Sequence, residues 1–306
     1  MAAPHVSGSF GDLLDPRFQK IFFEQFNQLP DMLGELFTVI PHNGRDIMTW
    51  SEIGAFGDWP AFTGTVSYDS LTQGYDTTAT YLEFASGFQV ERKLYDDDQY
   101  NIMDRRPVAL ATAAQRTRQR HGARLLNNAF TVDSFFNVRS EGVALCSDAH
   151  TTNAPGVSTA SGFDNAGTSA LSATAVAAAR IAMTGYRDDR GNFIQTAPDE
   201  LWYPPNLYEV AEEISASIGK LDTANNNKNV HQGRYTNKEW TYLTDSNNWF
   251  LVDSTLRKQS VFWIDRVPVE FAFAEDLDTI IAKWRGYMRY ANAFVEWRWI
   301  YGSNVS

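Results

Sequence analysis

The chain has 306 residues, a formal net charge of −11 and a single cysteine, Cys146. Its length allows one large domain or two intertwined ones. The acidic balance argues against tight wrapping of nucleic acid, which depends on Lys and Arg neutralising phosphates. One cysteine excludes an internal disulfide, and a hydrophobic fraction of 43% excludes disorder of the whole chain.

Aromatic residues make up 14% of the chain. Such side chains suit the buried centres of protein interfaces, and they equally suit surfaces that bind sugars. The N-terminal stretch MAAPHVSGSFGDLLD lacks the basic region and apolar core of a secretory signal. No run reaches the roughly 18 apolar residues of a membrane span. We therefore expect a soluble protein that is made in the cytoplasm.

The first predicted element is an amphipathic helix that follows a short N-terminal arm. Asp15 suits the helix cap and Pro16 the first helical position, and Pro30 ends the pattern. The apolar residues that recur at helical spacing are Phe18, Ile21, Phe22, Phe26 and Leu29. This helix either packs on the chain's own core or docks on another subunit.

Residues 58–84 combine aromatic and acidic side chains and contain no Lys or Arg. The aromatics are Trp59, Phe62, Tyr68, Tyr75, Tyr81 and Phe84, and the acids are Asp58, Asp69, Asp76 and Glu83. The second half of this region, Tyr75–Leu94, alternates as a half-buried strand would. The alternation is clearest where Phe88, Val90 and Leu94 alternate with Gln89, Glu91 and Lys93. We predict a long two-stranded hairpin whose turn lies in residues 69–74, with positive φ at Gly74. A lone hairpin is marginal in water unless something packs on it.

A long helix is predicted from about residue 104 to about residue 130. Pro107 suits its first turn, Gly122 lies inside it, and its apolar stripe is thin. Its middle is polar nearly all round, which is typical of a helix that spans a surface or bridges other parts. The basic residues there are Arg116, Arg118, Arg120 and Arg124. Without interleaved aromatics they do not form a platform for single-stranded nucleic acid.

The second half of the chain begins with a long loop of small polar residues at 146–172. A helix capped by Ser172 and ended by Gly185 follows. A short strand and a second helix, with apolar spacing from Leu207 to Ile218, come next. Residues 223–234 predict an exposed tip. From Trp240 onward short apolar or alternating runs predict strands, and these include the final run FVEWRWIYGS.

No catalytic or metal-binding template fits the chain. A phosphate-binding loop, a dinucleotide fingerprint and a nucleophile elbow are all missing. Cys146 and His150 are too few for a structural zinc site, which uses about four ligands. The acids at Asp96–Asp98 lack the spacing of a calcium loop, and residues 188–191 (DDRG) read as a turn. We therefore expect a binding or structural protein, with no enzyme activity, cofactor or metal.

Several stretches in this order resemble the major capsid proteins of tailed bacteriophages. SEIGAFGDWPAFTGTVSYDSLTQGYD is similar to an extended loop, and RKLYDDDQYNIM and LLNNAF bracket what would be the spine helix. RGNFIQTAPDELWYPPNLYEVAEEI resembles the strand-to-helix passage of an axial domain, and WRWIYGS a peripheral strand. The resemblance covers nearly the whole chain. It is closest to the group of the Mu-like major head subunit and implies the α+β, Hong Kong 97-type capsid fold.

The resemblance implies a division of the chain into four parts. Residues 1–50 would form the N-terminal arm and first helix, and residues 51–87 the extended loop. Residues 88–145 and 245–306 would form the peripheral domain with the spine helix at about 104–130, and residues 146–244 the axial domain. Some family members carry a scaffold segment ahead of the arm. In this chain we expect it to be absent, already removed or a separate protein.

The implied function is self-assembly, through hexamers and pentamers, into an icosahedral shell around double-stranded DNA that is not bound by sequence. The implied partners are a portal protein and a scaffold, with a decoration protein left open, and no membrane is involved. The virion would be assembled in the host cytoplasm. Some of these shells crosslink through a Lys in the extended loop, but residues 46–92 contain no Lys. The contacts of this loop must then be non-covalent.

We expect the acidic hairpin to lie on the basic helix of a neighbouring copy, with Asp69 facing Arg118 as one candidate pair. The predicted interface residues are Trp59, Phe62, Tyr68, Asp69, Asp76, Arg105, Arg106, Arg116, Arg118, Arg120 and Arg124. Two other classes stay open. A Trp-rich glycan-binding protein would explain the aromatics, although the helical part fits it poorly. An enzyme with a metal at the acidic turn would lack a nucleophile or base beside the metal.

Overall fold

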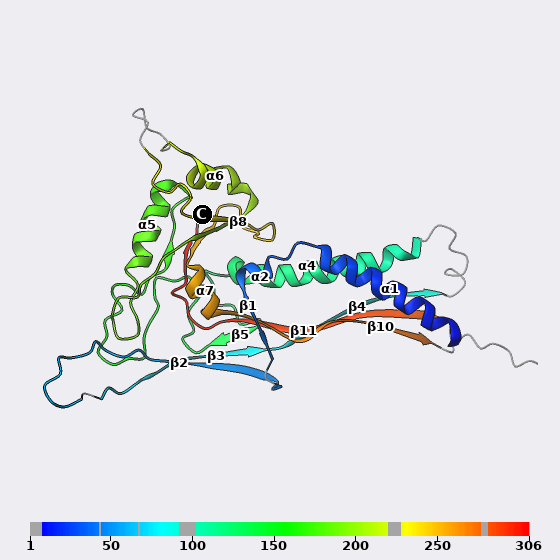
Figure 1. Ribbon diagram of the computed structural model, residues 1–306, viewed down its shortest axis with the longest axis horizontal. Helices are drawn as coiled ribbons and strands as arrows, with labels where there is room; N and C mark the ends of the chain where they lie inside the picture. Colours follow the sequence, from blue (N-terminus) through cyan, green and yellow to red (C-terminus); the bar gives the residue numbers. More distant parts are fainter. Residues whose placement is uncertain are drawn as a thin grey trace, which may run out of the picture.

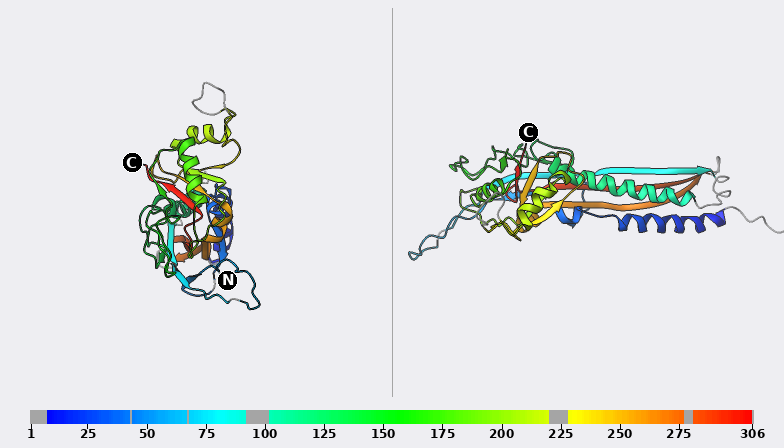
Figure 2. Two further views of the ribbon diagram at one scale, coloured as in Figure 1. Left: turned by 90° about the vertical axis from the view of Figure 1, so that its left-hand side faces the viewer. Right: turned by 90° about the horizontal axis from the view of Figure 1, so that it is seen from above.

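The computed structural model describes residues 8–42, 44–66, 68–91, 102–219, 228–276 and 281–305. The molecule has an elongated body, a lobe at one end of it, and a loop that projects beyond that end (Figure 1). The view from above in Figure 2 shows the same loop extending away from the long strands of the body.

The elongated body is a four-stranded sheet in the order β1-β10-β11-β4. Its strands are β1 (Thr38–Pro41), β10 (Val261–Asp276), β11 (Ile281–Phe294) and β4 (Leu82–Glu91). The long strands β10 and β11 pair antiparallel, whereas β1 joins β10 in parallel. Helices α1 (Gly8–Gln28) and α4 (Arg105–Asn127) cover one face of this sheet (Figure 1).

Helix α1 begins earlier than the sequence predicts. It starts at Gly8 and carries Pro16 in its interior, so the predicted start at Asp15 and Pro16 is wrong. Nothing in the described contacts explains why the helix continues before Pro16. Its apolar face does pack inward as expected, because Phe18 lies 5.1 Å from Trp284 and Phe22 lies 4.9 Å from Phe271 between ring centroids.

The long polar helix is confirmed as α4, preceded by the short turn η1 (Ile102–Asp104). Its thin buried stripe packs on α1 and on strands β4 and β11 of the body. At Gly122 an added Cβ atom would lie 2.1 Å from Leu33 Cδ2 of α2 (Leu33–Leu36) and 3.3 Å from Trp240 Cη2. The glycine therefore permits a close crossing, and α4 bridges the body and the lobe.

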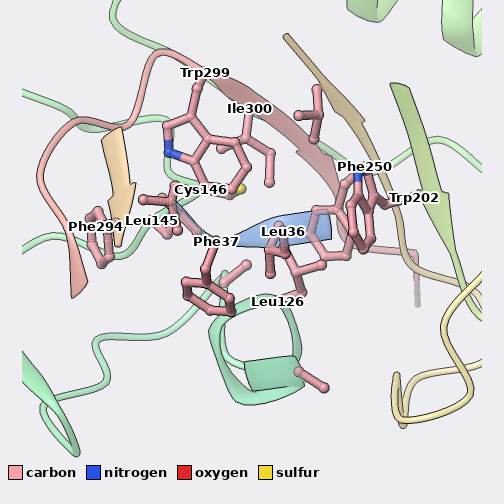
Figure 3. Packing of buried hydrophobic residues seen from close by; sticks show 14 of the residues in the cluster. Leu36, Phe37, Leu126, Leu145, Cys146, Trp202, Phe250, Phe294, Trp299 and Ile300 are labelled. Carbon is pink, nitrogen blue, oxygen red and sulfur yellow. The ribbon is translucent and has the colours of Figure 1, made fainter. Parts of the chain in front are cut away.

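The lobe is built on a five-stranded sheet in the order β6-β12-β9-β7-β8. These strands are β6 (Ala166–Gly167), β12 (Ile300–Ser303), β9 (Trp249–Val252), β7 (Glu200–Tyr203) and β8 (Thr236–Glu239). The flanking helices are α5 (Ala173–Thr184), η2 (Pro205–Leu207), α6 (Tyr208–Ala216) and α7 (Ser254–Ser260). Figure 3 shows side chains from α4, from the segment of Leu36 and Phe37, and from the lobe converging in one core.

Several predictions for the lobe hold and two do not. Ser172 caps α5 by accepting a hydrogen bond from the Ala175 amide at 3.1 Å, and Gly185 ends the helix, as predicted. Helix α7, capped by Asp253, was missed within a region that predicted only strands. The final run alternates in sequence, but residues 295–299 are not strand, and Trp297, Trp299 and Ile300 are all fully buried.

The hairpin forms, but its strands and turn differ from the prediction. Strand β2 (Ile47–Ile53) pairs antiparallel with β3 (Gln73–Thr80), and β3 also pairs with β5 (Asn137–Arg139). The connection is the segment 54–72, here called the apical loop, in which Gly64 has φ 104°. Gly74 lies inside β3 and not in a turn. The predicted alternation at residues 88–91 is confirmed in β4, which pairs with β11 and belongs to the body sheet. Lys93 and Leu94 lie outside the described residues.

Replacing Gly122 by Ala should destabilise the fold despite the better helix propensity of Ala. The added methyl group meets the buried Leu33 side chain, and overpacking costs about 1–3 kcal/mol, whereas the propensity gain is about 1 kcal/mol. Urea unfolding of Gly122→Ala should show a lower midpoint. Gly34→Ala is the matched control, because no atom lies within 4 Å of its added Cβ. Equal midpoints for the two variants would contradict the close crossing.

Candidate functional site

The apical loop carries the most exposed aromatic side chains of the described chain. Trp59 is 95% exposed, Tyr68 92% and Phe62 76%. Together with Phe56 and Val66 they surround a hollow of about 600 Å³ that is formed by the loop alone. A contiguous exposed apolar patch of this kind marks an interaction surface.

The two limbs of the apical loop are tied to each other and to the turn 188–191. Asp69 Oδ2 accepts a hydrogen bond from the Gly57 amide at 3.1 Å, which joins the limbs. Arg190 Nη2 donates to Asp69 Oδ1 at 3.1 Å and to the Ser70 carbonyl at 2.6 Å. The Gly57 amide and then the Arg190 guanidinium lower the pKa of Asp69. The predicted turn at 188–191 is therefore also a point of attachment for the loop.

Below this attachment a buried cluster of charges holds the base of the hairpin. Arg139 Nε donates to Glu141 Oε2 at 2.8 Å, and its Nη2 donates to Glu52 Oε2 at 3.2 Å. Arg298 Nη1 donates to Glu296 Oε1 at 2.7 Å and lies 3.9 Å from Glu52 Oε1. Burial and then the charge of Glu296 raise the pKa of Glu52, and the two arginines oppose this shift. The cluster joins β2, the end of β5 and the segment before β12.

His150 completes the cluster and does not act with Cys146. Its Nδ1 lies 3.0 Å from Glu141 Oε1, its Nε2 lies 3.2 Å from Asn165 Oδ1, and its ring stacks on Trp297 at 4.1 Å. Burial opposes ionisation of Glu141, but hydrogen bonds from His150 and Arg139 and from the Thr151 amide lower its pKa to about 2.

Cys146 lies in the apolar core of the lobe, where burial raises the pKa of its thiol. Within the described part of the chain no group of three or more His, Cys, Asp or Glu side chains could hold a metal ion. The acidic run Asp96–Asp98 lies outside the described residues, and so do residues 223–227 of the predicted tip. In the described part of the tip, residues 228–234, Val230 is exposed, but Asn229 and His231 are buried. Among the described helices none is long and apolar enough to cross a membrane.

The predicted interface residues fall into two groups. Arg118 forms a bidentate pair with Asp265 at 2.8 and 3.1 Å, and Arg124 one with Asp133 at 2.7 and 2.9 Å. Asp69 is bound to Arg190 within the same chain. The predicted pairing of Asp69 with Arg118 of a neighbouring copy would therefore require both of these ion pairs to break, and it stays a prediction.

The second group remains available at the surface. Arg105, Arg106, Arg116 and Arg120 are exposed on α4 and have no ion-pair partner among the residues that the structure describes. Asp76 lies in β3 and accepts a hydrogen bond from Gln73 Nε2 at 3.2 Å. Sequence reasoning missed Glu52, Arg139 and Arg190, because the ion pairs Arg139–Glu52 and Arg190–Asp69 join positions 87 and 121 residues apart.

Comparison with known proteins assigns the family. A family model described as phage capsid protein matches residues 74–303, so the chain belongs to the phage capsid proteins. It is a structural subunit of a virion shell, and its α+β fold is the phage capsid fold of the Hong Kong 97 type. No curated protein sequence matches the chain.

Three solved structures show the extent of the fold similarity. The capsid of Cyanophage P-SCSP1u has a TM-score of 0.59 at 10% identity, covering 89% of this chain and 86% of the other. The mature capsid of bacteriophage PhiM1 has 0.56 at 8% identity, with coverages of 91% and 88%. The procapsid of bacteriophage JBD30 has 0.53 at 14% identity, with coverages of 98% and 77%. Neither the family nor these neighbours support a glycan-binding protein.

The low pKa of Glu141 predicts an acid-sensitive contribution to stability. Its folded pKa of about 2 is below the ordinary value of 4.5, so the contribution is fully present above pH 4.5 and is lost as the pH falls towards 2. Glu141→Gln should therefore destabilise the protein clearly at pH 6 and less at pH 3, measured by urea unfolding at both pH values. A destabilisation that is larger at pH 3 would contradict this sign.

Proposed function

We propose that this capsid protein assembles, without covalent crosslinks, into an icosahedral shell that encloses the double-stranded DNA of a tailed bacteriophage. The observation that carries the proposal is an exposed aromatic loop on a rigid charged base, in a chain with the phage capsid fold. In this proposal the shell is assembled in the host cytoplasm from hexamers and pentamers, with a portal protein and a scaffold as partners. A decoration protein is left open.

The apical loop is proposed to lie on the next copy of the chain. Burying its large aromatics would stabilise the contact by several kcal/mol before ordering costs, at about 25 cal/mol per Å² of apolar surface. The loop segment 54–72 contains no Lys or Arg and carries Asp58 beside Trp59. An acidic, aromatic segment of this kind is complementary to an apolar surface that is flanked by basic side chains.

Helix α4 offers such a surface. Between α4 and the body sheet lies a hollow of about 400 Å³, lined on the helix by Leu110, Ala113 and Ala114 and on the sheet by residues of β4, β10 and β11. Residues three and four positions apart are neighbours on a helix surface, so Arg106 lies beside Leu110, with Arg120 further along that side of the hollow. Both guanidiniums are exposed, and we propose that the hollow receives Trp59 of the neighbouring copy.

The division of labour within the subunit is proposed on the same basis. The body with α4 as spine helix corresponds to a peripheral domain, and the lobe to an axial domain, as the sequence resemblance implies. Within the family, we propose that the chain groups with the Mu-like major head subunit. The net charge of −11 supports an inner surface along which packaged DNA slides, because few phosphates would be neutralised.

Assembly itself is tested by negative-stain microscopy of the purified chain at rising concentration. Closed shells or rings of subunits are expected. A monomer at every concentration and salt tested would contradict the proposed function.

Trp59→Ala should abolish or strongly reduce shell formation while leaving the unfolding midpoint unchanged, since this side chain is almost fully exposed in the subunit. Trp59→Phe is the matched control and should retain assembly, because it keeps a large apolar ring. Light scattering and microscopy provide the measurement. Normal assembly of Trp59→Ala would show that this residue does not dock.

The receiving surface is tested by a disulfide between copies. Ala61 is exposed in the apical loop beside the same hollow, so a cysteine there keeps the Trp59 ring. Ala61→Cys combined with Ala113→Cys should give a ladder of crosslinked chains in oxidised shells, and the native Cys146 is buried and does not compete. Each single variant, and Ala61→Cys with Thr174→Cys on α5, should give no ladder. Shells without crosslinks in the first pair would place the receiving surface elsewhere.

A further inference from the structure

We propose that Arg190 is a positioning residue for the apical loop, which fixes the direction of the loop in the free subunit so that Trp59 is presented in its docking orientation. This inference rests on the proposed function. It assigns a role to the turn 188–191, which by sequence is only a turn.

The loop side of the contact is built around Asp69. Its carboxylate accepts from the Gly57 amide on the outgoing limb and from Arg190, while Arg190 also donates to the Ser70 carbonyl on the returning limb. These hydrogen bonds close the loop between Gly57 and Ser70, and the Arg190 guanidinium binds the closed end. A guanidinium that donates two hydrogen bonds to one carboxylate fixes the relative orientation of the two groups as well as the distance between them.

The turn side is rigid and comes close to the loop at a second point. Asp188 Oδ1 accepts from the amides of Arg190 at 2.9 Å and Asn192 at 2.8 Å, and Gly191 has φ 87°. Asp189 Oδ1 accepts from the Ala55 amide at 2.9 Å. An added Cβ atom on Gly54 would lie 2.4 Å from Asp189 Oδ2. This approach is independent of Arg190 and shows that the loop base is fitted to the turn.

The hairpin and its apical loop are held by two sets of ion pairs, a buried set at the base of the hairpin and an outer pair that is partly exposed to solvent. The Arg139 and Glu52 side chains of the buried set are 4% and 18% exposed, whereas Arg190 and Asp69 are 25% and 38% exposed. Loss of the outer pair should therefore loosen the loop without unfolding the hairpin. Because the outer pair faces water, salt screens it. Docking of a loop that is already oriented loses less conformational freedom than docking of a loose one.

The first test is hydrogen exchange of the unassembled subunit, followed in peptides from the apical loop. Arg190→Ala and Asp69→Asn should each speed exchange there about three- to tenfold, the range expected when an exposed ion pair and its accompanying hydrogen bonds are lost. The exchanged pair Asp69→Arg with Arg190→Asp should restore part of the protection. Added salt should speed exchange in the wild type but not in Arg190→Ala.

Arg285→Ala is the matched control, because Arg285 is exposed on β11 and has no ion-pair partner among the described residues. It should leave exchange in the apical loop unchanged. Unchanged exchange in Arg190→Ala, or no recovery in the exchanged pair, would overturn the assignment. An unchanged unfolding midpoint in Arg190→Ala is expected and separates loosening of the loop from misfolding.

The second test compares assembly rates at equal protein concentration. Arg190→Ala should assemble more slowly by a factor similar to its gain in exchange, and the exchanged pair should recover part of the rate. A loosened loop with an unchanged assembly rate would overturn the positioning role and leave the proposed shell function intact. Failure of the wild type to assemble would instead overturn the proposed function, while the exchange data would still decide whether Arg190 orders the loop.

Discussion

The buried ion-pair cluster at the foot of the hairpin is the interaction on which the rest of this structure depends. Glu52 comes from the hairpin, Arg139 and Glu141 from β5 and the turn after it, and Arg298 from the chain leaving the body. Charges removed from water must keep their partners, because removing one partner leaves the other uncompensated. The cluster therefore ties the hairpin to β5 and to the segment that leads from the body into the lobe.

The charged cluster at the base of the hairpin supports a loop whose far end carries exposed aromatic side chains. A large apolar side chain in water is a liability unless a partner covers it, and the subunit covers Trp59 and Tyr68 hardly at all. The fold instead holds them away from the body on a tethered loop, beyond the end of the sheet (Figure 1). The same chain carries exposed guanidiniums on α4, so identical copies can supply what each one lacks. This complementarity is the physical basis of the proposed shell.

Helices α4 and α5 were predictable from local signals, whereas the start of α1 and the whole of α7 were not. Helix α5 has a Ser cap and a terminal Gly, and α4 has Pro107 in its first turn, so local chemistry decides where each lies. Trp297 and Trp299 alternate with charged residues like a half-buried strand, but Arg298 between them is buried as well. Its burial is possible because Glu296 and the Arg187 carbonyl accept its hydrogen bonds. A period of two in the sequence cannot reveal such a charge partner.

The sequence by itself determined that the chain is acidic, that its extended loop lacks Lys, and that aromatics gather beside acids in that loop. These properties follow from composition and from neighbouring residues in the chain. They limit the loop to non-covalent apolar and charged contacts. Only the tertiary structure decided which charges are free to make it. Arg118 and Arg124 are engaged by Asp265 and Asp133, and Asp69 is engaged by Arg190 across 121 positions. An ion pair forms between side chains that folding brings close in space. The spacing of two residues along the chain does not indicate how far apart their side chains lie in the folded protein.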